Sequence, residues 1–386
     1  MHINATKTMT IVLGLLILCG TAGAVRIIAG PYLQEPSDTS MTVMWITDQN
    51  STSWVEYGPD DSLDRKAYRT RHGLIDACRT IHKVKIQGLT PGTSYRYRVR
   101  SKEIVNFDPY DVTFGDTVAS ETFAFTTLSR AKKAFSFVVL NDIHEKNEIL
   151  TSLAKRAEGK PYDLLFLNGD MLGHIENQQQ IIDHVLAPCT ELFASRTPFI
   201  YVRGNHEARG RFARNLPDYI ALPQDRFYYA FRHGPVRFIV LDGGEDKHDS
   251  EEVYAGLIDF DRYRDAQRQW LMQEIQSDAF KQAPFRVVVV HMPPMPSERW
   301  HGTNDMYNKW RPVLNQGKVD LLICGHTHHY EIAGPEEGVR DFPMVIGGAP
   351  NPGAATLIRV DVTASMLDLT MTRDDGKIVG TYCIRK

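Results

Sequence analysis

Residues 135–144 read Phe135-Ser136-Phe137-Val138-Val139-Leu140-Asn141-Asp142-Ile143-His144, an apolar run that ends abruptly in polar side chains. A continuous apolar run of this length is typical of a strand buried on both faces. Similar runs recur at 163–167, 199–202, 238–241, 287–290 and 321–323. Because helix-like segments separate these runs, we expect an α/β layered domain from residue 135 onward.

The segments between the runs predict helices at 148–157, 177–194, 261–280 and 304–314. The tail 343–386 returns to short alternating strands, with Asp374-Asp375-Gly376 as a hairpin turn. We expect these last strands to extend the sheet of the same domain, which would then cover 135–386.

The region before residue 128 has a different pattern, with short apolar–polar alternations at 40–45, 82–86 and 95–99. Turn residues at 58–59 and 88–92 separate them, and no amphipathic helix intervenes. This pattern predicts an all-β sandwich at 25–128, which carries no convincing catalytic cluster. The polar segment 129–134 is the expected linker to the α/β domain.

The N-terminus resembles an export signal. Lys7 precedes an apolar run at 11–18, and Ala22-Gly23-Ala24 supplies a small-residue cleavage site, so we expect residues 1–24 to be removed. The alternative is a membrane-anchored lipoprotein modified at Cys19. No later stretch has the length of a membrane span, so an exported location, periplasmic or extracellular, is expected.

The charge and the cysteine content bear on possible partners and on disulfide bonds. Lys and Arg total 44 against 47 Asp and Glu, so the net charge of −3 indicates no nucleic-acid partner. Removal of Cys19 would leave an even number of cysteines, which export would permit to pair but which show no disulfide framework. These are Cys78, Cys189, Cys324 and Cys383.

Potential metal ligands follow the ends of the predicted strands, where open α/β sheets place their ligand sites. Imidazole, carboxylate and amide oxygen together suit Zn, Mn or Fe. The candidate ligands are Asp142, His144, Asp170, Asn205, His291, His326 and His328. Seven ligands exceed the needs of one ion, so we predict two ions about 3.5 to 4 Å apart, bridged by Asp170.

At this point the sequence resembles the calcineurin-like metallophosphoesterases, and its front sandwich resembles the fibronectin-III-like domain of the purple acid phosphatase branch. In the front sandwich, the residues that match the family are 30–34, 55–58 and 88–95. In the α/β domain, the five segments that contain the candidate ligands follow one another in the same order as in the family. The resemblance implies two packed sheets flanked by helices in the catalytic domain. It also implies an enzyme, a metal-dependent phosphoric ester hydrolase.

The resemblance also assigns the ligands. Asp142, His144 and His328 would hold the first metal, Asn205, His291 and His326 the second, and Asp170 both. Residues two apart in an extended segment face the same side, which supports pairing Asp142 with His144 and His326 with His328.

Two further histidines are carried over as substrate-binding residues. His206 follows Asn205 and would face the substrate phosphate as an acid or transition-state stabiliser. His301 lies in the loop after His291, where related phosphatases carry substrate-facing histidines. Purple acid phosphatases place a tyrosine three residues after the bridging aspartate, but here that residue is Gly173, which leaves the metal identity open among Fe, Zn and Mn.

The expected function is an exported binuclear phosphomonoesterase that hydrolyses small phosphate esters by a metal-held hydroxide. A phosphodiesterase or nucleotidase on the same core is the alternative, and a surface binding protein with a degenerate phosphatase domain is an alternative of another class. Other polar residues are interpreted as structural or surface residues. These are His174, Arg209, Arg211, Asp242, His248, Cys324 and His329.

Overall fold

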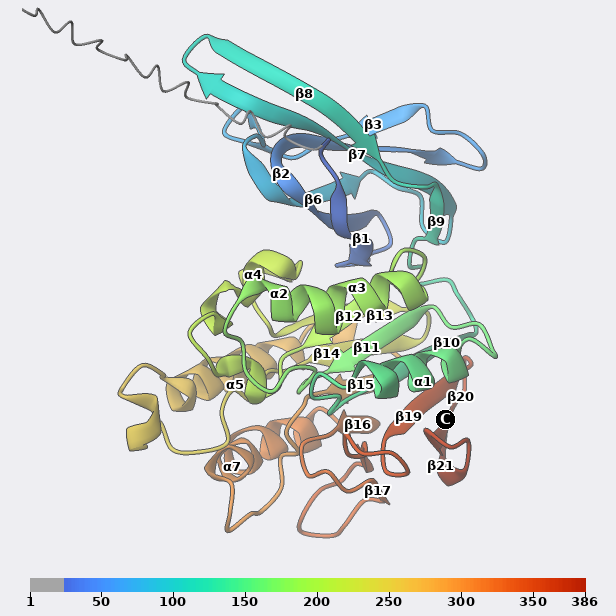
Figure 1. The fold of residues 1–386 in the computed structure, drawn as a ribbon. Helices are drawn as coiled ribbons and strands as arrows, with labels where there is room; N and C mark the ends of the chain where they lie inside the picture. The colour runs from blue at the N-terminus through green and yellow to red at the C-terminus, as the bar shows by residue number, and fades with distance from the viewer. Residues whose placement is uncertain (1–23) are drawn as a thin grey trace, which may run out of the picture.

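The structure, a computed structural model, describes residues 24–386. The predicted export signal and Cys19 therefore lie outside the described residues, apart from Ala24. Figure 1 shows a β-rich front module stacked on a larger domain, with α2 and α3 of the larger domain lying between them. None of the helices within 24–386 combines the length and the apolar character needed to cross a bilayer.

The front module is built around β2, a 20-residue strand (Ser40–Pro59). The first half of β2 pairs with β1 and with most of β6, whereas its second half pairs with β3 and β7, so β2 joins the two parts of one seven-stranded sheet. The other strands are β1 (Ile27–Gln34), β3 (Arg65–Ala67), β4 (Thr70–Arg71), β5 (Leu74–Ile75), β6 (Arg79–Gln87), β7 (Ser94–Asp108), β8 (Asp111–Ala119) and β9 (Phe123–Thr126). The predicted all-β module is confirmed.

The larger domain holds two six-stranded sheets, in the orders β12-β11-β10-β19-β20-β21 and β13-β14-β15-β16-β18-β17. The first sheet consists of β10 (Phe135–Leu140), β11 (Leu164–Asn168), β12 (Phe199–Val202), β19 (Thr356–Val362), β20 (Met366–Arg373) and β21 (Ile378–Arg385). The second consists of β13 (Tyr229–His233), β14 (Val236–Val240), β15 (Phe285–Val289), β16 (Leu321–Cys324), β17 (Glu331–Ala333) and β18 (Met344–Ile346).

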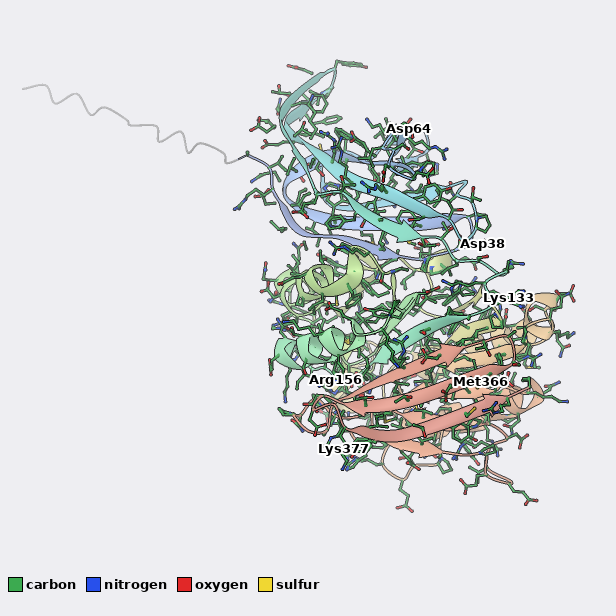
Figure 2. The ribbon with its side chains drawn as sticks, turned by 90° about the vertical axis from the view of Figure 1, so that its right-hand side faces the viewer. Asp38, Asp64, Lys133, Arg156, Met366 and Lys377 are labelled. Carbon is green, nitrogen blue, oxygen red and sulfur yellow. The ribbon has the colours of Figure 1, made fainter. Side chains whose placement is uncertain are left out.

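The tail strands extend the first sheet as predicted, because β19 pairs with β10 and a turn at 374–376 joins β20 to β21. Figure 2 shows this part of the sheet, with Met366 and Lys377 at opposite ends of it. The two sheets pack face to face over an apolar core, in which the rings of Phe137 and Phe238 meet edge to face at 5.1 Å. Burial on both faces explains why the strands of this domain are continuously apolar.

Helices cover the outer faces of both sheets. Over the first sheet lie α1 (Asn147–Ala157), α2 (Gln178–Ile181), η1 (Ile182–Leu186), α3 (Ala187–Cys189), η2 (Thr190–Ala194) and α4 (Leu216–Tyr219), and over the second lie α5 (Phe260–Glu274), α6 (Asp278–Lys281) and α7 (His301–Gln316). Short 3-10 turns are η3 (His206–Ala208), η4 (Ala213–Asn215), η5 (Pro223–Asp225) and η6 (Glu252–Tyr254).

Two predicted helices differ in detail from the structure. The segment 177–194 is helical, but η1 and η2 are π-helical, and Pro188, which has no N–H to donate, lies between them. The segment 261–280 is divided, because the Ser277 side chain accepts a hydrogen bond from Phe280 N and starts α6 as a separate helix.

The front module shares buried contacts with the catalytic domain. Tyr32 and Tyr97 donate hydrogen bonds from their hydroxyls to the carbonyls of Tyr219 and Ser195, at 2.9 and 2.8 Å. The 129–134 segment has no helix or strand, and Ser129 N donates to a ring nitrogen of His233. The four cysteines of the described residues are all free thiols, so none of them forms the disulfide that the sequence left open.

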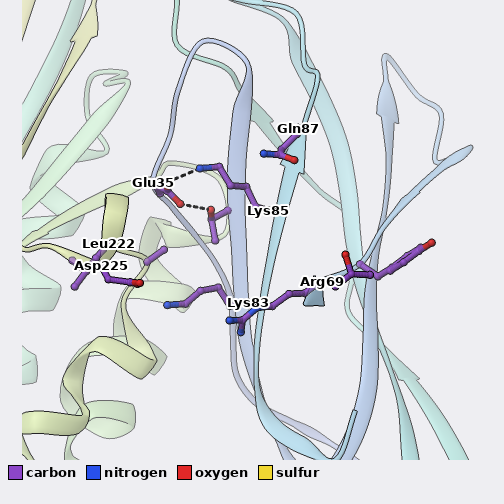
Figure 3. Close-up of a pocket in the computed structure, with 11 residues that line it drawn as sticks. Glu35, Arg69, Lys83, Lys85, Gln87, Leu222 and Asp225 are labelled. Atoms are coloured by element: carbon purple, nitrogen blue, oxygen red, sulfur yellow. Dashed lines mark hydrogen bonds and ion pairs between the residues drawn. The ribbon is translucent and has the colours of Figure 1, made fainter. Parts of the chain in front are cut away.

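A hollow of about 330 Å³ opens between the front module and residues 221–225 (Figure 3). Lys85 pairs there with Glu35 at 2.6 Å, and Lys83 donates to the carbonyl of Ile220 at 2.9 Å. None of the predicted site residues lines this hollow, so the candidate functional site lies elsewhere in the fold.

Candidate metal centre

The seven predicted ligands lie after the carboxyl ends of five strands. Three of these strands, β10, β11 and β12, belong to the first sheet, and β15 and β16 belong to the second. Because the strands run parallel within each sheet, their polar ends reach the same edge of the two-sheet core. The fold therefore brings together residues that are up to 186 positions apart, as Asp142 and His328 are.

The backbone at this edge is strained. Five of the seven residues have a positive φ, a region that residues other than glycine rarely adopt. They are Asp142 (53°), His144 (47°), Asp170 (51°), His326 (73°) and His328 (59°). Such conformations, which cost on the order of 1–3 kcal/mol each, cluster at functional sites.

Gly169 allows the two sheets to approach each other closely at the centre. Its φ is 78°, and a Cβ atom on it would collide with the imidazole of His291. Gly325 has the same function on the other side, because a Cβ there would meet the carboxylate of Asp142. Both glycines are therefore required for the space that a Cβ atom would fill, and Gly169 also for its left-handed backbone.

The first group of donors consists of Asp142, His144 and His328, whose ligand atoms lie within 4.8 Å of one another. The two histidines bring their Nε2 atoms to 3.1 Å, and His328 Nε2 lies 3.4 Å from Asp142 Oδ1. Asp170 Oδ2 lies 3.7 Å from His144 Nε2, so this carboxylate borders the first group.

The second group consists of Asp170, His291 and His326, and Asn205 adjoins it. His291 Nε2 lies 3.1 Å from Asp170 Oδ2, and His326 Nδ1 lies 3.0 Å from Asn205 Oδ1. Asp170 also forms a donor group with His144 and His206, so its carboxylate has possible ligands on both sides, as a bridging carboxylate needs.

The ring of His291 is oriented as in a metal-binding histidine. Its Nδ1 lies 2.8 Å from the carbonyl of Asn168, which can only accept, so Nδ1 carries a hydrogen and Nε2 is the nitrogen left to bind a metal. The Nε2 atoms of His291 and His326 are both buried without a hydrogen bond to any described residue. Buried, unpaired nitrogen donors beside carboxylates fit a metal centre.

The pKa values of the buried ligands also fit a metal centre. Burial alone would raise the pKa of Asp170, but His291 and the other neighbouring imidazoles hold it well below its usual range. Burial would lower the pKa of His291, yet the carboxylates of Asp170 and Asp142 raise it to about 10. Burial and the nearby His291 lower the pKa of His326 to about 4. Cations would compete with protons for these donors.

Glu207 is a structural residue of the site that the sequence reasoning did not single out. Its carboxylate is fully buried and accepts hydrogen bonds from the backbone N–H groups of Asp170, Met171, Leu172 and Gly204 and from the Tyr201 hydroxyl. It thereby ties the loop after β11 to the loop after β12. Its position directly after Asn205 and His206 in the sequence could have identified it as a residue of the site.

His206 lies beside Asp170, with its Nε2 3.9 Å from Asp170 Oδ2. Its Nδ1 is 2.7 Å from the carbonyl of Gly173, the residue that stands where purple acid phosphatases have a tyrosine. The neighbouring His174 is exposed, so it does not fill the place of the missing tyrosine.

Arg209 is not the surface residue that we expected. Its guanidinium makes a bidentate pair with the buried carboxylate of Glu245, at 2.6 and 2.9 Å, and its Nη1 lies 3.0 Å from His206 Nε2. The expectation was wrong because Glu245 lies 36 positions further along the chain. Arg211, by contrast, is exposed as predicted.

The structure does not bring His301 to the ligand groups. His301 Nε2 lies 2.7 Å from Asp261 Oδ1, and its ring stacks on exposed His248 at 3.5 Å. His301 begins α7, so its side chain turns toward α5, whereas the preceding residue, Trp300, packs its ring 4.6 Å from that of His326.

The remaining residues lie where the sequence suggested. Asp242 is buried at a turn, where it accepts from Gly244 N and pairs with Arg203. Cys324 is buried in its strand, and His329 is exposed.

Two family models match the chain. Calcineurin-like phosphoesterase matches 135–330, just over half of the chain, and the purple acid phosphatase N-terminal domain matches 31–127. Among curated relatives, purple acid phosphatase 21 of Arabidopsis thaliana is 25% identical over 318 residues, with 75% of this chain and 63% of the relative covered. Acid phosphatase type 7 of Mus musculus is 24% identical over 353 residues, with 83% and 73% covered.

The chain thus spans less than two thirds of the first of these relatives. Two solved structures share the fold: a purple acid phosphatase from yellow lupin (Lupinus luteus) seeds, with a TM-score of 0.68, 16% identity and 94% of this chain and 74% of that chain covered, and PhoD, with a TM-score of 0.63, 11% identity and 92% and 91% covered. The chain therefore belongs to the calcineurin-like phosphoesterase family, with a purple acid phosphatase N-terminal domain in front of its catalytic domain.

Proposed function

We propose that this chain is a metal-dependent phosphoesterase that hydrolyses phosphate monoesters with two metal ions. The observation that carries the proposal is the position of Asp170 between two groups of nitrogen and oxygen donors, some of which are buried without partners. The family membership and the acid phosphatase names of its relatives also support it.

The ligands that we assign keep the division implied by the sequence. Asp142, His144 and His328 would hold one ion, Asn205, His291 and His326 the other, and Asp170 both. When bound, such ions lower the pKa of a water molecule and offset the charge that develops on the phosphoryl oxygens. Gly173 offers no phenolate, so the donor set suits Zn, Mn or Fe(II) as well as a mixed-valent iron pair.

The protein's own residues would orient the substrate and the departing oxygen. The ring of His206 lies close enough to His144 and Asp170 to form a donor group with them, but we assign it no ligand role, so the ring would face a phosphate held there. Strained loops, fixed by Glu207 beneath them, would keep these side chains in place without substrate.

Activity measurements on a matched pair of substrates test the proposal. The purified chain, loaded with Zn or Mn, should hydrolyse an aryl phosphate monoester faster than the corresponding diester, and a chelator should abolish turnover. A faster diester reaction would favour the phosphodiesterase alternative. Absence of both bound metal and turnover would favour a binding protein with a degenerate phosphatase domain.

We also propose that the chain is exported after cleavage behind Ala24. Support comes from Lys7, the apolar run 11–18 and the Ala22-Gly23-Ala24 triplet. Mass spectrometry of the mature protein should find Val25 at the N-terminus. A lipid-modified Cys19 would instead identify the lipoprotein alternative.

A further inference from the structure

Arg209 is held rigidly beside the candidate metal centre. Glu245, which receives its bidentate pair, is only 1% exposed and also accepts a hydrogen bond from the Tyr254 hydroxyl at 2.8 Å. The loop that carries Glu245 is itself fixed, because the buried guanidinium of Arg264 donates to the carbonyls of Gly243 and Glu245. A guanidinium clamped in this way cannot swing freely toward a ligand.

The charge of Arg209 is already neutralised. Its Nη2 lies 3.2 Å from Asp246 Oδ1, in addition to its pair with Glu245, and Lys247 pairs with the same Asp246. Two cations and two carboxylates therefore cancel within this group. These four side chains have no net positive charge that would attract a phosphate, which argues against Arg209 as an independent phosphate-binding site.

The remaining contact of Arg209 is the one with His206. A guanidinium can only donate and a carbonyl can only accept, so Arg209 donates to His206 Nε2 and His206 Nδ1–H donates to the carbonyl of Gly173. Both ring nitrogens of His206 are thereby fixed, and so is the orientation of the ring beside Asp170.

We propose that Arg209 is a positioning residue, which holds the ring of His206 over the metal centre by means of the buried carboxylate of Glu245. This inference rests on the proposed phosphoesterase function, because it concerns the same site. Arg209 acts through His206, so its removal should lower kcat and leave KM nearly unchanged.

A double-mutant cycle on an aryl phosphate monoester tests the proposal. The variants are Arg209→Ala, His206→Ala and the combination of both. Arg209→Ala should lower kcat by about 10- to 100-fold, the usual effect of losing a residue that orients a site group. In the His206→Ala background, Arg209→Ala should have almost no further effect. Equal losses in both backgrounds, or a raised KM with an unchanged kcat, would contradict the proposal.

A control variant, a conservative variant and a metal analysis make the result unambiguous. Arg211→Ala is the matched control, because this exposed arginine pairs with Glu176 on the surface, and its activity should equal that of the wild type. Arg209→Lys keeps one charged donor and should recover part of the lost kcat, and elemental analysis should find the wild-type metal content in every variant. An inactive wild type would contradict the proposed function itself. If the wild type is active and Arg209→Ala has the same kcat, only the positioning role is contradicted.

Discussion

Asp170 Oδ2 lies 3.1 Å from His291 Nε2, although Asp170 follows a strand of the first sheet and His291 follows a strand of the second. The two atoms are close, yet they do not form an aligned hydrogen bond, and His291 Nε2 has no other partner among the described residues. This is the arrangement expected of two ligands that share an ion. The centre therefore depends on the packing of both sheets.

Asp170→Asn should remove metal from both groups of donors, because it replaces a carboxylate that belongs to the second group and lies 3.7 Å from His144 of the first. We expect elemental analysis to find far fewer than two ions per chain, with loss of phosphatase activity. Asp116→Asn changes an exposed aspartate of β8 and serves as the control. If Asp170→Asn kept its full metal content, Asp170 would not be the bridge.

His206→Ala should separate catalysis from metal binding. We assign His206 no metal-binding role, so the variant should keep the wild-type metal content while kcat falls by about 100-fold or more, because a residue that orients the substrate phosphate is lost. Steady-state kinetics and elemental analysis on the same preparation measure both. Loss of metal together with activity would make His206 a ligand.

Gly169→Ala should destabilise the folded protein, because the new methyl group would meet the His291 ring in addition to the strain of a positive φ. Gly73→Ala is a matched control, since Gly73 also has a positive φ, 83°, but has open space around its Cβ position. Chemical denaturation should show a loss of about 1 kcal/mol for the control and a clearly larger loss for Gly169→Ala. Equal losses of stability in the two variants would show that the contact with His291 does not contribute to the destabilisation.

His82 should make the stability of the front module sensitive to acid. Burial lowers the pKa of His82 to about 3, so the folded state favours the neutral ring, whereas an unfolded histidine titrates near 6.5. This contribution to stability is complete above pH 6.5 and is lost as the pH falls toward 3. Between pH 6.5 and 4 the free energy of unfolding should fall by up to about 3 kcal/mol.

The measurement is chemical denaturation at several pH values, for the wild type and for His82→Gln. The substituted side chain does not titrate, so the variant should lose less stability over the same pH range. Identical pH dependence in the two proteins would show that His82 does not carry the effect.

Much of the fold and of the candidate site could be predicted because both follow local rules. Continuous apolar runs identified the strands around 137 and 166, and the polar residues after them, such as Asp142 and Asp170, had to meet at one sheet edge. Other features depend on contacts that no local pattern contains. Arg209 reaches Glu245 from a distant loop, and His301 is turned toward Asp261 by the start of α7.

The central claim is that Asp170 lies between two metal ions. Anomalous diffraction from crystals of the Zn- or Mn-loaded protein tests it most directly. We predict two anomalous peaks, one on each side of the Asp170 carboxylate, with His328 beside one and His291 beside the other. A single peak, or peaks that do not touch Asp170, would contradict the account.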